Sequence, residues 1–314
     1  MADSLIVLAI GGNSLIRDEQ HRSVPDQWAL TRDTCHHIAA IAAAGHRLVI
    51  THGNGPQVGF ILRRSELARS ELHEVPLDSC DADTQGAIGY MIQQSLENEF
   101  ARRGLARRAV AVVTQVEVDI SDPIAMRPTK PIGSFMDETT ARTRARENGW
   151  TVAEDAHRGW RRLVPSPLPT AIVEIDAITD LVRDGFVVIA AGGGGIPVVR
   201  GADGTHRGIE AVIDKDEASS LLATTIGADL FAISTAVPHV CLHFAQPNEQ
   251  PLTRLTVAEA RRYLADGEFG SGSMAPKIHA AIRFLERGGR RAVVTSPEAL
   301  EAAIAGDAGT TIVP

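Results

Sequence analysis

Residues 4–13 read SLIVLAIGGN and residues 47–56 read RLVITHGNGP, and these two stretches decide the fold class. Each begins with a short apolar run, which is typical of a strand buried on both faces of a sheet. Each run ends in a loop rich in glycine and asparagine, and a third stretch, FVVIAAGGGG over residues 186–195, follows the same plan. Because such strands alternate with longer helical patterns, we predict an α/β fold with a mainly parallel sheet and helices on both faces.

The remaining elements alternate in the same way along the chain. Besides the three strands above, apolar runs predict strands over residues 109–115, 229–234, 291–295 and 310–313. Helices are expected over residues 26–44, 57–70, 83–103, 174–184, 215–226, 257–266, 276–287 and 297–305. The sequence contains no internal repeat or low-complexity tract, and we expect a single domain over residues 1–314.

Residues 117–169 interrupt this alternation. The stretch contains six prolines, clusters of arginine, and the tryptophans Trp150 and Trp160. Since tryptophans imply packing, an unstructured linker is not expected here. We predict that residues 117–169 form an inserted subdomain that protrudes from the sheet and acts as a lid.

The composition is that of a globular protein, with 44% hydrophobic and 22% charged residues among 314. A net charge of −8 argues against binding to nucleic acid or to an anionic membrane. The first residues carry no basic segment, and their apolar run is too short for a signal peptide or a membrane span. Three widely spaced cysteines, Cys35, Cys80 and Cys241, are expected to be reduced and to pack as small hydrophobic side chains, which indicates a cytoplasmic protein.

The basic residues are divided unevenly between arginine and lysine. Of 31 basic residues, 28 are arginine, and the three lysines are Lys130, Lys215 and Lys277. All three lie in short segments rich in Gly, Pro and Asp, namely TKPIG, IDKDEAS and SMAPK. A compact ammonium differs chemically from a forked guanidinium, so these positions are candidates for a specific role. Chance survival of each lysine is the alternative, but their shared setting favours a function.

The glycine-rich loops after the strands predict a binding crevice. In an open α/β sheet, ligands bind at the carboxyl ends of the strands, where successive backbone N–H groups can hold an anion. Turn geometry alone explains one such loop, but three loops at one edge favour an anion site. His52, between a strand and one of these loops, is a further candidate residue.

Several common motifs are absent from the sequence. It contains no Gly-Lys pair of a Walker A loop, no G-x-G-x-x-G after the first strand and no protein-kinase signature. It also lacks H-E-x-x-H and C-x-x-C, and its 11 histidines are scattered. A dedicated metal site is therefore not expected.

The order of several other motifs is similar to that of a known family. The segments are AIGGNSL (9–15), VITHGNGPQVG (49–59), QGAIGY (85–90), KPIGSF (130–135), VPSPLPTAIVE (164–174), VIAAGGGGIPV (188–198), GIEAVIDKDEAS (208–219) and EFGSGSMAPKI (268–278). Together they span nearly the whole chain and resemble the carbamate kinases, a branch of the amino acid kinase superfamily. The resemblance implies a three-layer αβα sandwich with a mainly parallel central sheet of about eight strands, a protruding subdomain and a cytoplasmic homodimer.

The resemblance also implies a reaction and its site residues. The reaction is reversible phosphoryl transfer between carbamoyl phosphate and ADP, which gives ATP and carbamate as part of arginine metabolism. Mg²⁺ is expected to arrive with the nucleotide rather than in a protein cage. The catalytic residues would be Lys130, Lys215, Asp216 and Lys277. The substrate would be bound by Gly11, Gly12, Asn13, Gly53, Asn54 and Gly55, and the nucleotide by Lys215, Gly272, Ser273, Met274 and Lys277.

The sequence departs from the family pattern at three places. Ser14 and Ala87 are mild changes, whereas HFAQP over residues 243–247 lacks a lysine that the family usually carries there. Two alternatives stay open at this point. One is another small-acid kinase of the same superfamily, and the other is a catalytically silent nucleotide sensor.

Overall fold

The computed structural model describes residues 3–12, 15–16, 18, 20–121, 123, 126–155, 159–270 and 272–314. Its largest element is an eight-stranded sheet with the order β15-β17-β16-β12-β1-β2-β9-β3. The strands are β1 (Leu5–Ile10), β2 (Arg47–His52), β3 (Ala109–Ala111), β9 (Val187–Ile189), β12 (Leu230–Ser234), β15 (Arg254–Thr256), β16 (Arg291–Thr295) and β17 (Thr310–Val313). All neighbouring strands are parallel except β16 and β17, which confirms the predicted mainly parallel sheet.

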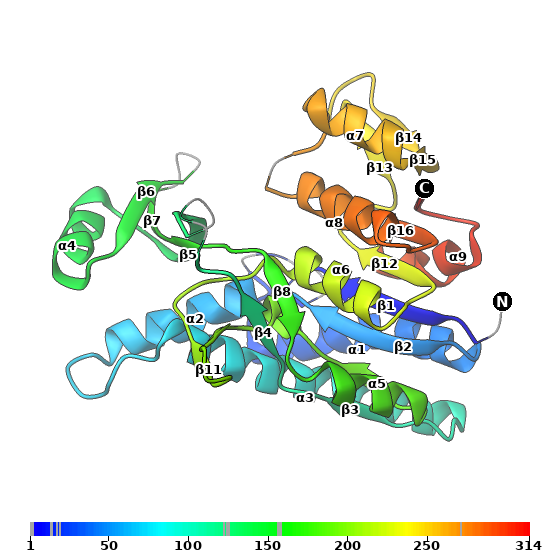
Figure 1. Ribbon diagram of the computed structural model, residues 1–314, viewed down its shortest axis with the longest axis horizontal. Coiled ribbons are helices and arrows are strands. Elements are labelled where there is room, and N and C mark those ends of the chain that lie inside the picture. Colours follow the sequence, from blue (N-terminus) through cyan, green and yellow to red (C-terminus); the bar gives the residue numbers. More distant parts are fainter. Residues whose placement is uncertain are drawn as a thin grey trace.

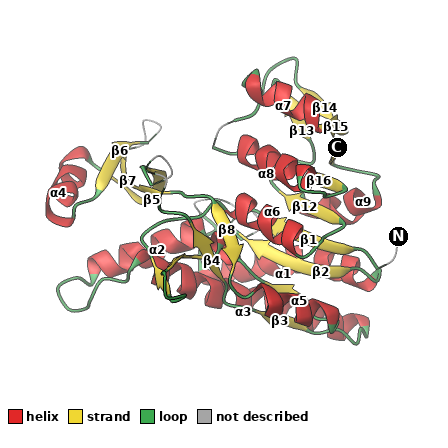
Figure 2. Ribbon diagram, viewed as in Figure 1, coloured by secondary structure: helices red, strands yellow, loops and turns green. Residues whose placement is uncertain are grey.

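Helices cover both faces of this sheet (Figures 1 and 2). One face is covered by α1 (Val24–Ala43), α3 (Leu77–Arg103) and α9 (Leu300–Ala305). The other is covered by α5 (Ile175–Arg183), α6 (Lys215–Thr225), α7 (Val257–Ala265) and α8 (Met274–Glu286). The predicted three-layer αβα sandwich is thus confirmed. None of the helices in the described ranges is long and apolar enough to cross a membrane.

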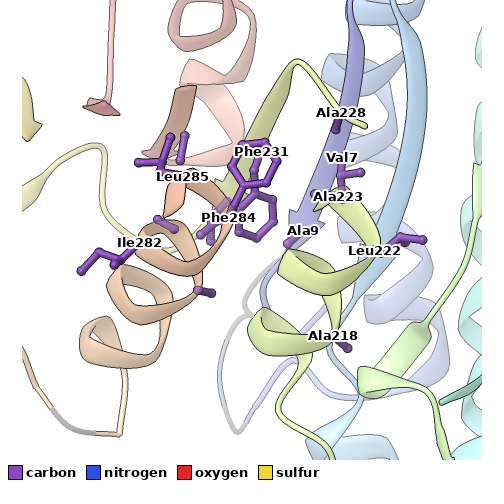
Figure 3. Close-up of a cluster of buried hydrophobic side chains, with 14 of the residues drawn as sticks. Val7, Ala9, Ala218, Leu222, Ala223, Ala228, Phe231, Ile282, Phe284 and Leu285 are labelled. Carbon is purple, nitrogen blue, oxygen red and sulfur yellow. The ribbon is translucent and has the colours of Figure 1, made fainter. Parts of the chain in front are cut away.

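Strand β1 explains why the sequence shows a continuous apolar run. Ile6 and Leu8 lie in the hydrophobic core on the side of α1 and α3, whereas Val7 lies in the core on the opposite side. In the core that contains Val7, Phe231 from β12 and Phe284 from α8 meet edge to face, with ring centroids 5.7 Å apart (Figure 3). A strand buried on both faces needs apolar residues at every position, and period-two alternation is therefore absent.

Two smaller sheets extend the main body. The first is four-stranded and contains β4 (Gln115–Val118), β8 (Pro169–Ile172), β10 (Ile196–Arg200) and β11 (His206–Gly208). The second is a hairpin of β13 (Val240–Leu242) and β14 (Gln250–Leu252). The sequence analysis predicted none of these as separate strands, because most are three or four residues long and partly exposed.

A third sheet projects from the main body (Figure 1). It contains β5 (Pro128–Met136), β7 (Trp160–Pro165) and β6 (Thr151–Glu154), and α4 (Glu138–Asn148) packs on it. Trp160 packs under the guanidinium of Arg142, which lies 5.4 Å from its ring centroid. The projecting part covers residues 128–165, while Glu117 and Val118 belong to β4. A single inserted unit over residues 117–169 that closes as a lid stays a prediction.

The predicted strand over residues 109–115 is wrong as one element. It is divided into β3, which ends at Ala111, and β4, which begins at Gln115. Between them, the side chain of Gln85 accepts from the backbone N of Thr114 at 2.7 Å and donates to its carbonyl oxygen at 3.1 Å. Gln85 thus replaces a strand partner, and the chain leaves the main sheet at Thr114. Helix α3, which supplies Gln85, begins at Leu77 rather than at the predicted residue 83.

Candidate active site

The loops after β1 and β2 meet at the carboxyl edge of the sheet. The backbone N of Gly53 donates to the carbonyl of Ile10 at 3.1 Å. A Cβ atom on Gly53 would lie 3.3 Å from the N of Gly12 and 3.3 Å from Cδ of Lys215. The missing side chain at Gly53 therefore allows both loops to approach one lysine closely. Helix α2 (Gly55–Leu67) starts directly after this loop.

Two lysines share one carboxylate at the N-terminus of α6. Nζ of Lys215 lies 2.6 Å from Oδ1 of Asp216, and Nζ of Lys277 lies 3.2 Å from Oδ2 of the same residue. Lys277 also donates to the carbonyl oxygen of Ser273 at 3.1 Å. Asp216 is only 2% exposed, so its negative charge is compensated by the two ammonium groups. Burial lowers the pKa of Lys277, and the charge of Lys215 adds to this effect, while Asp216 opposes it.

The third lysine reaches the same helix from the projecting sheet. Nζ of Lys130 in β5 lies 3.0 Å from Oδ2 of Asp214. Asp214 is also the N-cap of α6, because its Oδ1 accepts from the backbone N of Asp216 at 2.9 Å. Burial opposes ionisation of Asp214, but Lys130 and Lys215 outweigh it, and the pKa of Asp214 is lowered. Sequence reasoning missed Asp214, although its place before Lys215 as a helix-capping residue was a usable signal.

A cavity of about 400 Å³ opens beside the lysines. Among the predicted site residues, Gly11, Gly12, Lys215, Gly272, Ser273, Met274 and Lys277 line it. The apolar part of the wall includes Phe244 and Phe269, and Cys241 lies beside them. A cavity lined by cations and by aromatic side chains suits a ligand that joins phosphates to a flat ring.

The other predicted residues do not line the cavity or lie outside the described residues. Gly53, Asn54 and Gly55 follow β2, as predicted, but do not line the cavity. Asn13 lies outside the described residues, as does Ser14. The three lysines come from separate segments of the chain, and the ion pairs given above bring Lys130 and Lys277 to the N-terminus of α6, where Lys215 lies beside Asp216.

The cysteines differ in their surroundings. Cys35 and Cys80 are buried, as expected for small hydrophobic side chains, whereas Cys241 is only half-buried and borders the cavity. Burial is the main cause that raises the pKa of the Cys241 thiol, and Glu249 raises it further. The neighbouring Phe244 belongs to the HFAQP segment and is exposed.

His52 is buried and neutral, and its imidazole packs against the loop after β9. Its Nδ1 lies 3.1 Å from the carbonyl oxygen of Gly53, which can only accept, so Nδ1 carries the proton. Burial lowers the pKa of His52 to about 4. A Cβ atom on Gly192 would lie only 2.2 Å from Nε2 of His52, so the imidazole occupies the space that a side chain at position 192 would need.

Asn54 is held by a buried polar network. Its Nδ2 donates to Oδ1 of Asp81 and to Oγ1 of Thr84, each at 2.9 Å. The three side chains are almost completely buried. Gly193 packs over the amide of Asn54, since a Cβ atom there would lie 2.1 Å from Nδ2. Sequence analysis selected Asn54 but neither Asp81 nor Thr84, because their helix is a separate segment of the chain.

Acidic and metal-binding side chains do not gather into a cage in the part of the chain that the structure describes. Within the described ranges, no group of three or more His, Cys, Asp and Glu residues could hold a metal ion. The three lysines of the site suit anionic ligands.

The comparisons with known proteins agree with this geometry. The model of the amino acid kinase family matches residues 4–296. The chain belongs to the amino acid kinase family. Among curated relatives, the carbamate kinase-like protein YahI of Escherichia coli K12 is 49% identical, with 98% of each chain covered. The carbamate kinase of Pyrococcus furiosus is 46% identical, with 98% of this chain and 99% of the relative covered.

A solved structure gives the same assignment within the amino acid kinase family. The structure described as carbamate kinase from Giardia lamblia bound to AMP-PNP has a TM-score of 0.93 and 38% identity, with 99% of each chain covered. The resemblance to carbamate kinases that the motifs predicted is confirmed over the whole chain.

Proposed function

We propose that this member of the amino acid kinase family is a carbamate kinase. It transfers a phosphoryl group reversibly between carbamoyl phosphate and ADP, and it thereby forms carbamate and ATP. One observation carries the proposal: three lysines, Lys130, Lys215 and Lys277, converge on the N-terminus of α6, where two of them, Lys215 and Lys277, line a cavity. The identity of 46% with the carbamate kinase of Pyrococcus furiosus supports the same reaction.

The chemistry demands alignment and positive charge more than acid–base catalysis. In the direction of ATP use, a carbamate oxygen forms a bond to the terminal phosphorus while the bond from that phosphorus to ADP breaks. Carbamate is already an anion, so its attack needs no general base. Lys215 and Lys277 would compensate the charge that develops on the transferred group, and Asp216 would hold both ammonium groups in place.

The remaining site residues receive roles from their positions. Gly11 and Gly12 would lie against the transferred phosphoryl group, and Gly12 would contact it through its backbone N–H, because the N–H of Gly11 donates to the carbonyl oxygen of Ser234 at 3.1 Å. Lys130 would approach the group from the projecting sheet. Asn13 is proposed for the same role on the resemblance alone. Gly53, Asn54 and Gly55 would line the carbamate side.

The nucleotide would occupy the 400 Å³ cavity. Its phosphates would lie toward Lys215 and Lys277, near Gly272, Ser273 and Met274, and its base toward Phe244 and Phe269. Mg²⁺ would enter as part of the nucleotide substrate and keep several of its waters. The homodimer, the cytoplasmic location and a place in arginine metabolism are implied by the resemblance and stay predictions.

A coupled assay for ATP tests the proposal directly. Purified protein with ADP, Mg²⁺ and carbamoyl phosphate should form ATP at a rate proportional to enzyme concentration. Faster ATP formation from another acyl phosphate would instead support a different small-acid kinase. Binding of ADP without any turnover would support a nucleotide sensor.

A further inference from the structure

The orientation of the Asn54 amide follows from the hydrogen bonds around it. Oγ1 of Thr84 donates its only hydrogen to the carbonyl oxygen of Asp81 at 2.8 Å. The same Oγ1 lies 2.9 Å from the Asn54 amide, where it can act only as an acceptor. The atom of Asn54 that faces Thr84 must therefore be the nitrogen, whichever protonation state Asp81 has.

Both hydrogens of this nitrogen are occupied. One is donated to Thr84 and the other to Oδ1 of Asp81 at 2.9 Å. An amide nitrogen has two hydrogens, so no donor is left for a ligand. The described residues provide no hydrogen bond to the amide oxygen of Asn54. With respect to the described residues, only this oxygen among the side-chain atoms of Asn54 has free capacity, as an acceptor.

Asn54 is next in sequence to a residue that approaches Lys215. Asn54 directly follows Gly53, whose backbone approaches Gly12 and the side chain of Lys215. Asp81 is 2% exposed and Thr84 is 1% exposed, and Gly193 packs over the amide, so water has little access to the network. In such surroundings, a polar group that lacks a hydrogen-bond partner in the complex weakens binding. A site of this kind therefore selects ligands that supply the missing partner.

We propose that Asp81 and Thr84 are positioning residues that present the Asn54 amide oxygen to the substrate, so that the site selects an acyl group carrying an N–H donor. This inference rests on the proposed function and deepens it. Carbamoyl phosphate carries an NH₂ group at the place where acetyl phosphate carries a methyl group of similar size. The first can donate to the Asn54 oxygen, and the second leaves that oxygen without a partner.

The test compares these two phosphoryl donors in wild type and in Thr84→Val. The measured quantity is the ratio of kcat/KM for carbamoyl phosphate to kcat/KM for acetyl phosphate, with ADP as acceptor. Valine keeps the shape of threonine but removes one of the two acceptors of the amide nitrogen, so that Asp81 alone holds the orientation of the amide. We expect this ratio to fall about tenfold, mainly through loss of activity with carbamoyl phosphate. Where acetyl phosphate is not turned over, its inhibition constant against carbamoyl phosphate supplies the comparison.

Two further variants separate positioning from folding. Thr84→Ser retains the hydroxyl and should retain the ratio. Thr31→Val makes the same change at another buried threonine, whose hydroxyl bonds Gln27 within α1, and it should also leave the ratio unchanged. If Thr84→Val does not fold, Asn54→Ala reports on the same ratio and should lower it.

The possible outcomes distinguish this inference from the proposed function. Equal losses with both donors in Thr84→Val, or an unchanged ratio, would overturn the inference while leaving a carbamate kinase. Failure of the wild type to form ATP from carbamoyl phosphate would overturn the proposed function itself.

Discussion

Lys130 and Asp214 lie 84 residues apart in sequence, and their side chains meet at 3.0 Å between Nζ and Oδ2. Lys130 belongs to the projecting three-stranded sheet, whereas Asp214 caps the helix that carries Lys215. The ion pair therefore couples the position of the projecting sheet to the N-terminus of α6. It also compensates the charge of Lys130.

The first prediction concerns movement of the projecting sheet. If Lys130 exchanges Asp214 for a substrate phosphate, saturating ADP and carbamoyl phosphate should slow hydrogen exchange over residues 128–165. In the ligand-free protein, Lys130→Met should make the same exchange faster. The effect should be at most about fivefold, because the ion pair is partly exposed and such pairs contribute little. Unchanged protection across residues 117–169 at saturation would argue against a lid.

The second prediction concerns pH and the buried carboxyl of Asp81. Burial raises its pKa from 3.8 to about 7, and the charge of Asp78 acts in the same direction, while the hydrogen bond from Asn54 opposes it. Between about pH 4 and pH 7, the folded protein holds a proton that the unfolded chain has lost, so this group makes stability fall as pH rises. Above pH 7, Asp81 is ionised in both the folded and the unfolded protein. The folded protein then bears the full free-energy cost of burying this charge.

Asp81→Asn removes this cost and keeps an oxygen that can accept from Asn54. The variant should therefore melt higher than wild type at pH 8, by the equivalent of about 1 to 4 kcal/mol, and this difference should shrink toward pH 4. Melting curves of both proteins at pH 4, 6 and 8 check this. A difference that stays constant with pH would show that Asp81 ionises normally in the folded protein.

The third prediction uses two glycines with the same backbone demand. Gly193 has φ +71° and Gly204 has φ +84°, and both angles disfavour other residues. A Cβ atom at Gly193 would strike Asn54 at 2.1 Å, whereas nothing lies within 4 Å of one at Gly204. Gly204→Ala should cost about 1 kcal/mol of stability and keep activity. Gly193→Ala should also displace Asn54 and lower kcat/KM about 100-fold. Equal kcat/KM values for the two variants would show that the position of Asn54 does not affect the reaction.

Much of the fold was predictable because its central strands are buried on both faces. The runs that became β1 and β12 are apolar at almost every position, and β2 contains an apolar run at residues 48–50, which is typical of strands buried on both faces. The short strands of the smaller sheets were not predictable, since three partly exposed residues carry no periodicity. The boundary at Thr114 depends on Gln85, which lies 29 residues away, and local sequence contains no trace of that contact.

The candidate site was predictable to a similar degree. The scarcity of lysine selected the three positions that the fold brings to α6, and strand-end glycines marked the crevice. The residues that hold the site residues in place could not be predicted in this way. Asp214 and Asp81 are two of 39 acidic residues, and only tertiary contacts distinguish them from the others. Supporting residues of this sort carry no chemical signature of their own.

The last prediction concerns the choice of lysine over arginine at the shared carboxylate. Lys215 and Lys277 meet Asp216 at 2.6 and 3.2 Å, and their side chains are only 18% and 11% exposed. A guanidinium is larger and planar, and it cannot occupy the volume of an ammonium without moving Asp216 or the ligand phosphates. We expect Lys277→Arg and Lys215→Arg to fold normally but to lose about 100-fold in turnover, which equals about 2.7 kcal/mol of transition-state stabilisation.

The matched control exchanges the same two residue types at a site without function. Arg102 is exposed at the end of α3, where it pairs with Glu99, and Arg102→Lys should leave turnover and melting temperature nearly unchanged. Turnover with ADP and carbamoyl phosphate is measured for all three variants, together with melting curves that exclude misfolding. Near-native rates for both Lys→Arg variants would mean that any cation suffices beside Asp216. The scarcity of lysine would then be a bias of the coding sequence, and the positions of Lys215 and Lys277 would lose their chemical explanation.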